Sequence, residues 1–184
     1  MKKLISVGIC LLMILSTVFY LTGCKSRSDE MSDLETYTTK QMTKTKKQVI
    51  KCINEQDKEG LKKLFSKDAQ KHIEDLDSKL DQFINTFNGN KIESKKSRDP
   101  NFEGSAQAQP LHIFGKYHLK LSNGDKYILF INTCDIDEHN KDREGIYQLV
   151  ILTFSSEEVP EDFRMEGTNN DYGIFIYSKD GTLL

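Results

Sequence analysis

The chain has 184 residues, of which 26 are Lys or Arg and 28 are Asp or Glu, so its formal net charge at pH 7 is −2. This balance excludes a strongly basic or strongly acidic class of protein. Without an apolar leader at the start of the chain, about 160 residues remain, an ordinary length for one domain with its own hydrophobic core.

The first residues have the layout of an export signal. A basic start, Met1-Lys2-Lys3, precedes an apolar run at residues 4–21. The run is about 18 residues long, so its length alone leaves a membrane-spanning helix open. The run ends at Leu21-Thr22-Gly23-Cys24, which resembles the lipobox of bacterial lipoproteins. An uncleaved signal anchor with a chance cysteine is the alternative.

The lipobox resemblance implies three expectations. Residues 1–23 are a lipoprotein signal peptide, and Cys24 carries a diacylglycerol lipid and becomes the new N-terminus. Two acyl chains anchor a protein stably where one does not, so the protein is expected at the outer face of the cytoplasmic membrane, in the cell envelope. No other cofactor is expected, and nucleic acid is not an expected partner of an exported domain.

Behind the cysteine, residues 24–32 form a polar tether that precedes a domain at residues 33–184. Two basic runs occur in this domain, at residues 44–51 and 91–98. We interpret both as solvated faces of a helix or strand, with a phosphate-binding or lipid-headgroup patch as the alternative.

Helical periodicity dominates the first half of the domain. Apolar residues on one stripe predict an amphipathic helix over residues 33–54. Asp57 is a predicted N-cap of a short second helix, and Ser66 caps a third. Helical spacing continues through residues 69–87, with a predicted bend near residues 75–77, and Gly89 suits a stop.

After residue 90 the apolar period changes from 3.6 to 2, which predicts strands. We expect an edge strand at residues 92–98, a loop at 99–110 and a hairpin of strands at 111–121 and 126–134. The Asn123-Gly124 pair predicts a two-residue type I′ turn. That register puts Tyr117 on one face with Ile128, and His118 on the other with Tyr127.

Two further strands complete the expected sheet. Residues 145–154 are apolar on both faces, which predicts a central strand covered on each side. Residues 157–171 are a predicted second long loop, and residues 173–177 are the last strand. We expect all strands to be antiparallel.

A resemblance follows from these elements. The stretches "EQDKEGLKKLFS" (residues 55–66) and "GIYQLVIL" (residues 145–152) resemble small NTF2-like, or cystatin-like, domains. With the lipobox, the hairpin and "GIFIYS" (residues 173–178), the chain resembles short uncharacterised bacterial lipoproteins with a domain of unknown function. The resemblance implies an α+β cone, with N-terminal helices packed on a curved antiparallel sheet of four to five strands. It concerns the fold and does not choose an activity.

Cysteines and acidic residues give no metal motif. Cys52 and Cys134 belong to no C-x-x-C pair, and we expect both to pack as lone buried thiols, with a disulfide as the alternative. The acidic stretch at residues 135–144 fails the EF-hand spacing, because its sixth position is Asn140 and its twelfth is Ile146. We therefore predict no metal site.

Two functional hypotheses follow. The favoured one is a non-enzymatic lipoprotein whose domain binds a small apolar ligand, a peptide or an envelope protein, with a homodimer as a further alternative. Its pocket would be lined by aromatic residues, although the same residues suit a plain core: Phe83, Phe87, Phe114, Tyr127, Tyr147, Phe154 and Phe175. The rival is a small isomerase- or hydrolase-like enzyme in the same cavity, with acid and base drawn from four residues: His118, Asp135, Tyr127 and Tyr147.

Overall fold

The computed structural model describes residues 27–97, 100–103, 110–160, 163 and 172–184. Leu21, Thr22, Gly23 and Cys24 lie outside the described residues. Contacts divide the chain into two units, residues 1–35 and 36–184. Within the described part of the chain, no helix is both long enough and apolar enough to span a bilayer.

Four helices come first in the described chain. They are α2 (Arg27–Glu55), α3 (Lys58–Lys62), α4 (Lys67–His72) and α5 (Leu76–Asn85). Helix α2 starts earlier than the predicted residue 33. Its first turn contains Asp29 and Glu30, whose negative charges interact favourably with the positive end of the helix dipole.

Both predicted N-caps are confirmed. The Asp57 carboxylate accepts a hydrogen bond from the Gly60 backbone N–H at 2.7 Å, and the Ser66 hydroxyl accepts one from the Ala69 N–H at 3.0 Å. The predicted bend at residues 75–77 is a full break, because Asp75 has a left-handed backbone (φ 51°) that an α-helix does not accommodate. The single helix expected over residues 69–87 is therefore two, α4 and α5.

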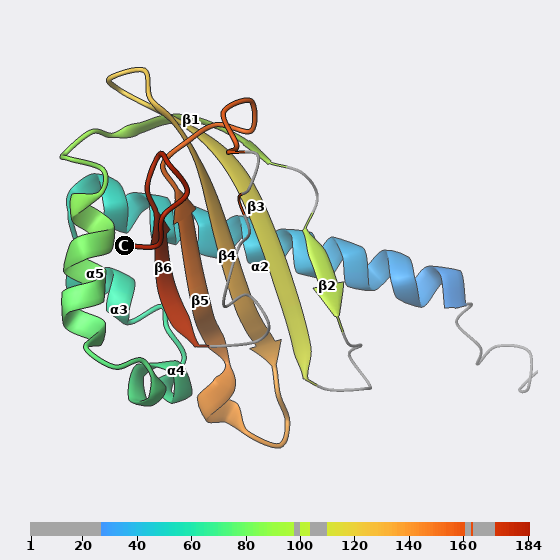
Figure 1. Ribbon diagram of the computed structural model, residues 1–184. Coiled ribbons are helices and arrows are strands. Elements are labelled where there is room, and N and C mark those ends of the chain that lie inside the picture. Colours follow the sequence, from blue (N-terminus) through green and yellow to red (C-terminus); the bar gives the residue numbers. More distant parts are fainter. Residues whose placement is uncertain (1–26, 98–99, 104–109, 161–162, 164–171) are drawn as a thin grey trace, which may run out of the picture. The chain divides into compact units, whose positions relative to one another are not determined.

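The strands form one sheet in the order β1-β3-β4-β5-β6, with β2 also paired to β3. The fold is α+β, with N-terminal helices packed on a mixed, mostly antiparallel sheet that does not close into a barrel (Figure 1). Strand β2 falls inside the segment expected to be a loop. The bounds are β1 (Ile92–Ser97), β2 (Asn101–Glu103), β3 (Leu111–Leu121), β4 (Lys126–Ile136), β5 (Gly145–Leu152) and β6 (Gly173–Tyr177).

The expectation of a fully antiparallel sheet is wrong at one pair of strands. Strand β6 runs parallel to β5, with Gly173 opposite Gln148 and Tyr177 opposite Leu152. A parallel pair requires the chain to return to the other end of the sheet before it re-enters, which takes a dozen residues or more. The segment between the two strands, residues 153–172, is long enough for this return.

The hairpin register also differs from the prediction by one residue. The Gly124 backbone N–H donates a hydrogen bond to the Leu121 carbonyl, and the Leu121 N–H donates one to the Asp125 carbonyl, each at 2.9 Å. Gly124 has a positive φ of 93°. The turn therefore has three residues, 122–124, instead of two. Leu119 lies opposite Tyr127, and His118 lies opposite Ile128. A one-residue shift exchanges the faces, so the predicted pairing of Tyr117 with Ile128 is wrong.

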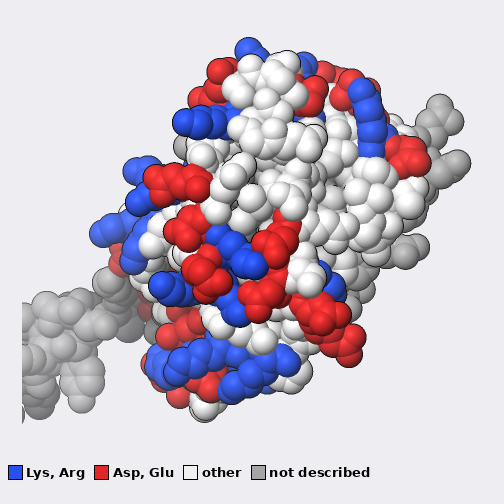
Figure 2. All heavy atoms as spheres, turned by 90° about the vertical axis from the view of Figure 1, so that its left-hand side faces the viewer, with Lys and Arg blue, Asp and Glu red and all other residues white. Residues whose placement is uncertain are grey.

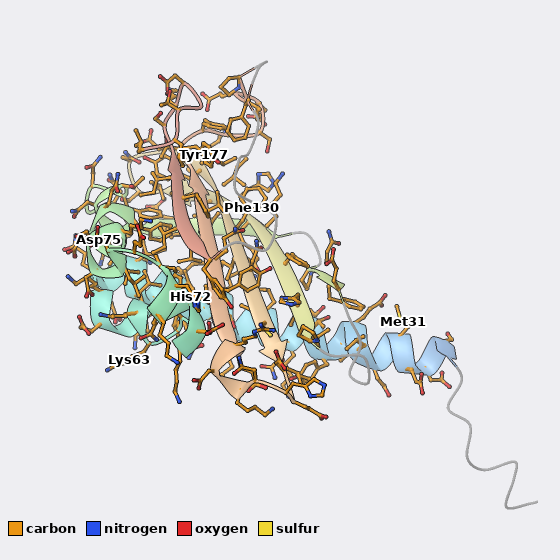
Figure 3. The ribbon with its side chains drawn as sticks, turned by 60° about the horizontal axis from the view of Figure 1, so that its bottom comes forward. Met31, Lys63, His72, Asp75, Phe130 and Tyr177 are labelled. Atoms are coloured by element: carbon orange, nitrogen blue, oxygen red, sulfur yellow. The ribbon has the colours of Figure 1, made fainter. Side chains whose placement is uncertain are left out.

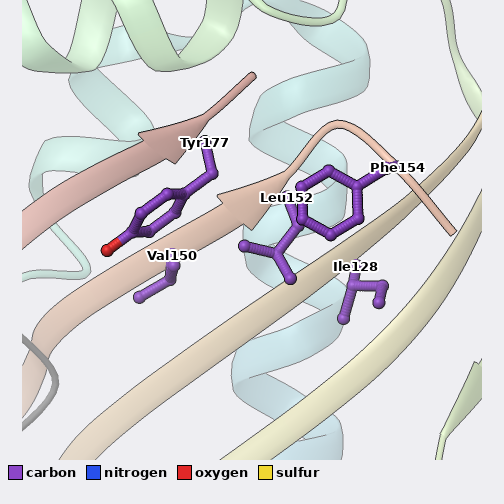
Figure 4. Packing of buried hydrophobic residues seen from close by; sticks show 5 residues of the cluster. All are labelled: Ile128, Val150, Leu152, Phe154 and Tyr177. Atoms are coloured by element: carbon purple, nitrogen blue, oxygen red, sulfur yellow. The ribbon is translucent and has the colours of Figure 1, made fainter. Parts of the chain in front are cut away.

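The sheet carries packed side chains on both faces, and it is fully buried on both at β5, whereas alternate residues of β3 are half-buried or exposed. Helices cover one face, where the Lys46 ammonium lies 4.9 Å from the Tyr117 ring centroid and Tyr127 packs against Phe87. The opposite face carries a second apolar cluster, which Figure 4 shows on the side of the strands away from α2. Its members are Ile128, Val150, Leu152, Phe154 and Tyr177, with Phe130, Phe163 and Phe175 packed against them. Strand β5 is the covered central strand that its apolar sequence predicted.

Candidate functional site

A β-bulge in β5 redirects one tyrosine side chain. Asn132 of β4 pairs with Gln148, and the next residue, Thr133, pairs with Ile146, so Tyr147 has no partner in the ladder. Strict alternation would turn Tyr147 toward the helices with Leu149. A bulge places two successive residues of one strand opposite a single residue, which re-aims a side chain. Tyr147 instead packs against His112, whose strand neighbours Phe114 and His118 lie on the face away from the helices.

His112 and Tyr147 form the centre of the candidate site. Their rings meet edge-on, with centroids 5.4 Å apart and an interplanar angle of 89°. Tyr147 is 4% exposed. Within the described part of the chain, the His112 Nδ1 atom and the Tyr147 hydroxyl are the two buried side-chain polar atoms that lack a hydrogen-bond partner. Such groups are rare in native proteins and point to a missing partner, such as water or a ligand.

Other aromatic rings surround this pair. The Phe114 ring stacks beside His112 with a centroid distance of 6.5 Å, and Tyr172 meets Tyr147 edge-on at 6.4 Å. On its other side, Tyr172 stacks on His72 at 5.1 Å. Figure 3 places His72 near the start of β6, at the opposite end of that strand from Tyr177. The site therefore lies at the β6 start rather than within the apolar cluster around Tyr177.

Charged groups lie at the border of the site, beside the aromatic rings. The Tyr172 hydroxyl donates to the Asp68 carboxylate at 2.5 Å. The Arg143 guanidinium lies 3.8 Å from Asp68 and 3.7 Å from Asp137, and so links the two carboxylates. Asp137 is 2% exposed and accepts hydrogen bonds from the backbone N–H groups of residues 139 and 140. All of these charges have partners, so they position Tyr172 and the loop instead of offering free charge to a ligand.

The helices hold the edge of the site through the backbone. The Ser66 N–H donates to the Ile146 carbonyl, and the Ile146 N–H donates to the Leu64 carbonyl, each at 2.9 Å. This close approach requires glycine at position 145, where φ is 132° and an added Cβ would lie 2.7 Å from the Ser66 nitrogen. Segment 64–66, which precedes the Asp68 helix, is thus fixed directly to the strand that bears Tyr147.

Burial keeps the central groups uncharged near neutral pH. It lowers the pKa of His112 below 6.5, although the Glu103 carboxylate acts in the opposite direction. Burial also raises the pKa of Tyr147 well above 10. For Tyr172, burial and then the hydrogen bond to Asp68 raise the pKa to about 12. The site thus offers a neutral imidazole and a neutral phenol, which can both donate and accept hydrogen bonds.

The four residues considered as acid and base do not meet at one site. His118 and Tyr127 line a groove of about 360 Å³ beside the hairpin, where the Ser156 hydroxyl lies 3.0 Å from the His118 Nδ1 atom. Asp135 lines another cavity, of about 230 Å³, and accepts a hydrogen bond from the Tyr37 hydroxyl at 2.6 Å. Only Tyr147 belongs to the candidate site.

The other members of the site were missed from sequence. His112, Tyr172, Asp68 and Arg143 are far apart in the chain, and none of them belongs to a recognisable motif. Alternation along the expected strand at residues 111–121 is the one sequence signal that could have grouped His112 with Phe114. The bulge that turns Tyr147 toward them has no sequence signal, because it depends on how β4 and β5 pair.

The aromatic residues proposed as pocket lining are divided between the two faces of the sheet. On the helix face, Phe83 packs against Phe87, four residues further along the chain, and Phe87 packs against Tyr127 of β4. Phe114 and Tyr147 belong to the candidate site, while Phe154 and Phe175 belong to the apolar cluster on the same side as that site. The described residues therefore form no single pocket lined by all seven.

The two cysteines are buried, and Asp142 of the acidic loop is paired with lysines. Cys52 and Cys134 are buried free thiols, as expected. Burial raises the pKa of Cys134 to about 11, so it is a poor nucleophile near neutral pH. In the acidic loop, Asp142 pairs with Lys67 and Lys71. No group of three or more His, Cys, Asp or Glu side chains suited to a metal ion occurs among the residues described.

Comparison with known protein families places this α+β domain. Residues 48–155, more than half of the chain, match the Domain of unknown function (DUF5104). The chain therefore belongs to the DUF5104 family. The matched segment contains His112, Tyr147, Asp68 and Arg143, whereas Tyr172 follows it. No curated protein matches the sequence.

Proposed function

We propose that this protein is an extracytoplasmic lipoprotein whose NTF2-like domain binds a small, uncharged and partly apolar ligand. One observation carries the binding proposal: the rings of His112 and Tyr147 are in contact, and the His112 Nδ1 atom and the Tyr147 hydroxyl are both buried without hydrogen-bond partners among the described residues. An unpartnered buried polar group costs about 1–3 kcal/mol. A ligand that supplies a donor and an acceptor removes this cost on binding.

The ligand class follows from the chemistry of the site. Because both groups are neutral near pH 7, they favour a hydroxyl, amide or carbonyl group over an ion. The rings of Phe114 and Tyr172 offer flat apolar contact on either side. The same neutrality disfavours the acid–base alternative: a histidine with a lowered pKa is a weak base, and a tyrosine with a raised pKa is a weak acid.

The membrane anchor is supported by sequence. Leu21-Thr22-Gly23-Cys24 ends an apolar run directly before a polar stretch. Replacing Cys24 with Ala tests this part of the proposal. Cell fractionation should show the wild type in the membrane fraction and less of the variant there. The mass of the wild type should include the diacylglycerol. An unmodified wild-type mass, or an unchanged membrane-bound variant, would contradict it.

Native mass spectrometry of the full-length protein, released gently from detergent, tests ligand binding. We expect a reproducible adduct on the wild type that is lost from Tyr147→Phe. Tyr127→Phe is the matched control, because it removes a hydroxyl from the opposite face of the sheet, where that group donates to the Thr86 carbonyl. An adduct that persists in Tyr147→Phe, or a bare wild-type protein, would overturn the binding proposal. A bare dimer would favour an interaction function instead.

A further inference from the structure

We propose that a stripe of four lysines on α2, Lys40, Lys44, Lys47 and Lys51, docks the domain on anionic phospholipid headgroups. This basic stripe would act as a second membrane contact, separate from the lipid. The inference rests on the proposed membrane anchoring of the chain, and it is independent of ligand binding at His112 and Tyr147.

The basic stripe occupies one side of the helix. Its lysines are spaced by four, three and four residues, which places them on a single helical face, and all four are exposed. The opposite side of α2 is buried against the domain through Met42, Val49 and Ile53. Lys46 belongs to neither group, because its ammonium lies over the Tyr117 ring. Of the five lysines on this part of α2, Lys46 therefore packs against the sheet, and the other four form the exposed basic stripe.

The charge of the basic stripe is largely uncompensated. Residues 36–54 contain five lysines and no Asp or Glu. Among the described residues, Lys40, Lys44 and Lys47 have no ion-pair partner, and Lys51 approaches Glu55 only at 3.8 Å.

The other helices are different. Lys58 pairs with Asp81 at 2.9 Å, and Lys62 pairs with Asp77 at 2.8 Å. Figure 2 shows positive and negative side chains interspersed over this side of the molecule, where α3, α4 and α5 lie. The lysines of α3 and α4 therefore have carboxylate partners within the domain, whereas the basic stripe is available to an external anion.

A bilayer is the occupant that fits the basic stripe. Lys40 follows Cys24 by sixteen residues, a separation of at most about 55 Å even for a fully extended chain. The stripe is about 17 Å long at 1.5 Å per residue, enough to meet several headgroups. Lysines close to an anionic leaflet are attracted to it, and the side chains among them, such as Thr43 and Gln48, are polar. Contact is therefore with headgroups, without insertion into the acyl region.

Such docking has a consequence for the candidate site. The basic stripe lies on the outer side of the helix that covers one face of the sheet, while His112 and Tyr147 meet on the other face. A domain resting on the stripe would turn the candidate site away from the bilayer.

Lysine footprinting tests the docking. The full-length protein is reconstituted into vesicles of phosphatidylcholine, with or without phosphatidylglycerol, and treated with an amine-acetylating reagent. We expect phosphatidylglycerol to slow acetylation of the basic stripe by about fivefold or more, and high salt to remove this protection. Acetylation of Lys120 and Lys179, which are exposed elsewhere, should not change. Equal rates in the two vesicle types, or protection that salt does not remove, would overturn the inference.

A pair of double variants completes the test. Lys44→Glu/Lys47→Glu should abolish the phosphatidylglycerol-dependent protection of Lys40 and Lys51, whereas the matched Lys120→Glu/Lys179→Glu should retain it. Loss of protection in both variants would indicate a general charge effect and would also overturn the inference. The protein mass, read from the same samples, reports lipid on Cys24. A failure of anchoring is thereby distinguished from a failure of docking.

Discussion

The imidazole of His112 meets the phenol of Tyr147 edge-on, with ring centroids 5.4 Å apart, and the described residues offer neither His112 Nδ1 nor the Tyr147 hydroxyl a hydrogen bond. The two residues are adjacent because a bulge in β5 turns Tyr147 away from the helices. Burying both polar atoms without a hydrogen bond lowers the free energy of unfolding. A cost of this kind is expected where a protein binds something.

Tyr147→Phe should leave the folded protein as stable or stabilise it by up to about 1 kcal/mol, because it removes a buried hydroxyl that has no partner. Tyr172→Phe makes the same chemical change nearby but breaks the 2.5 Å hydrogen bond to Asp68. It should cost about 1.5–3 kcal/mol, as for a hydrogen bond to a charged group. Urea unfolding of both variants checks this. Equal losses would show that the Tyr147 hydroxyl does have a stabilising partner.

Lowering the pH should decrease the free energy of unfolding, because His112 takes up a proton. Because burial lowers the folded-state pKa of His112 below 6.5, the unfolded chain takes up this proton first. The contribution of the neutral imidazole is complete above about pH 6.5 and is lost as the pH falls toward the folded-state pKa, by at most about 1.4 kcal/mol per pH unit.

The measurement is urea unfolding of wild type and His112→Gln between about pH 7.5 and pH 5. The wild type should lose more stability than the variant over this range. Carboxylates such as Glu144, whose pKa is lowered chiefly by the hydrogen bond from Lys141, act in a more acidic window and are common to both proteins. Parallel pH profiles would rule out this role of His112.

Gly145→Ala should destabilise the protein by about 2 kcal/mol or more, because the position combines a φ of 132° with an added Cβ 2.7 Å from the Ser66 nitrogen. Gly124→Ala separates the two effects. That glycine also has a positive φ, 93°, but nothing lies within 4 Å of an added Cβ, so only about 1 kcal/mol of backbone strain is expected. If thermal unfolding gave equal losses, the contact between β5 and the helices would not be tight.

Phe154→Ala should cost about 3–5 kcal/mol, because its side chain is fully buried in the apolar cluster on the face away from the helices. Val159→Ala, at a residue 44% exposed in the same return segment, should change stability by no more than about 0.5 kcal/mol. Chemical unfolding of the two variants measures the difference. A small effect of Phe154→Ala would mean that this face is not a second core.

Local features of the chain were predictable because their causes are local. Asp57 and Ser66 cap their helices through hydrogen bonds to residues three positions ahead. The apolar run that begins at Gly145 predicted a strand buried on both faces, and the change of period after residue 90 marked where helices give way to strands. These features need only a few neighbouring residues, so the α+β class was predictable as well.

By itself, the sequence determined the order of helices before strands, the N-caps Asp57 and Ser66, and the lipoprotein-like start, which stays a prediction. Only the tertiary structure decided the three-residue turn that exchanges the hairpin faces, the parallel pairing of β6 and the bulge at Tyr147. Register depends on which backbone groups of two distant strands meet, and a shift of one residue reverses every side chain. The meeting of His112 with Tyr147 depends on such pairing, so no local pattern could reveal it.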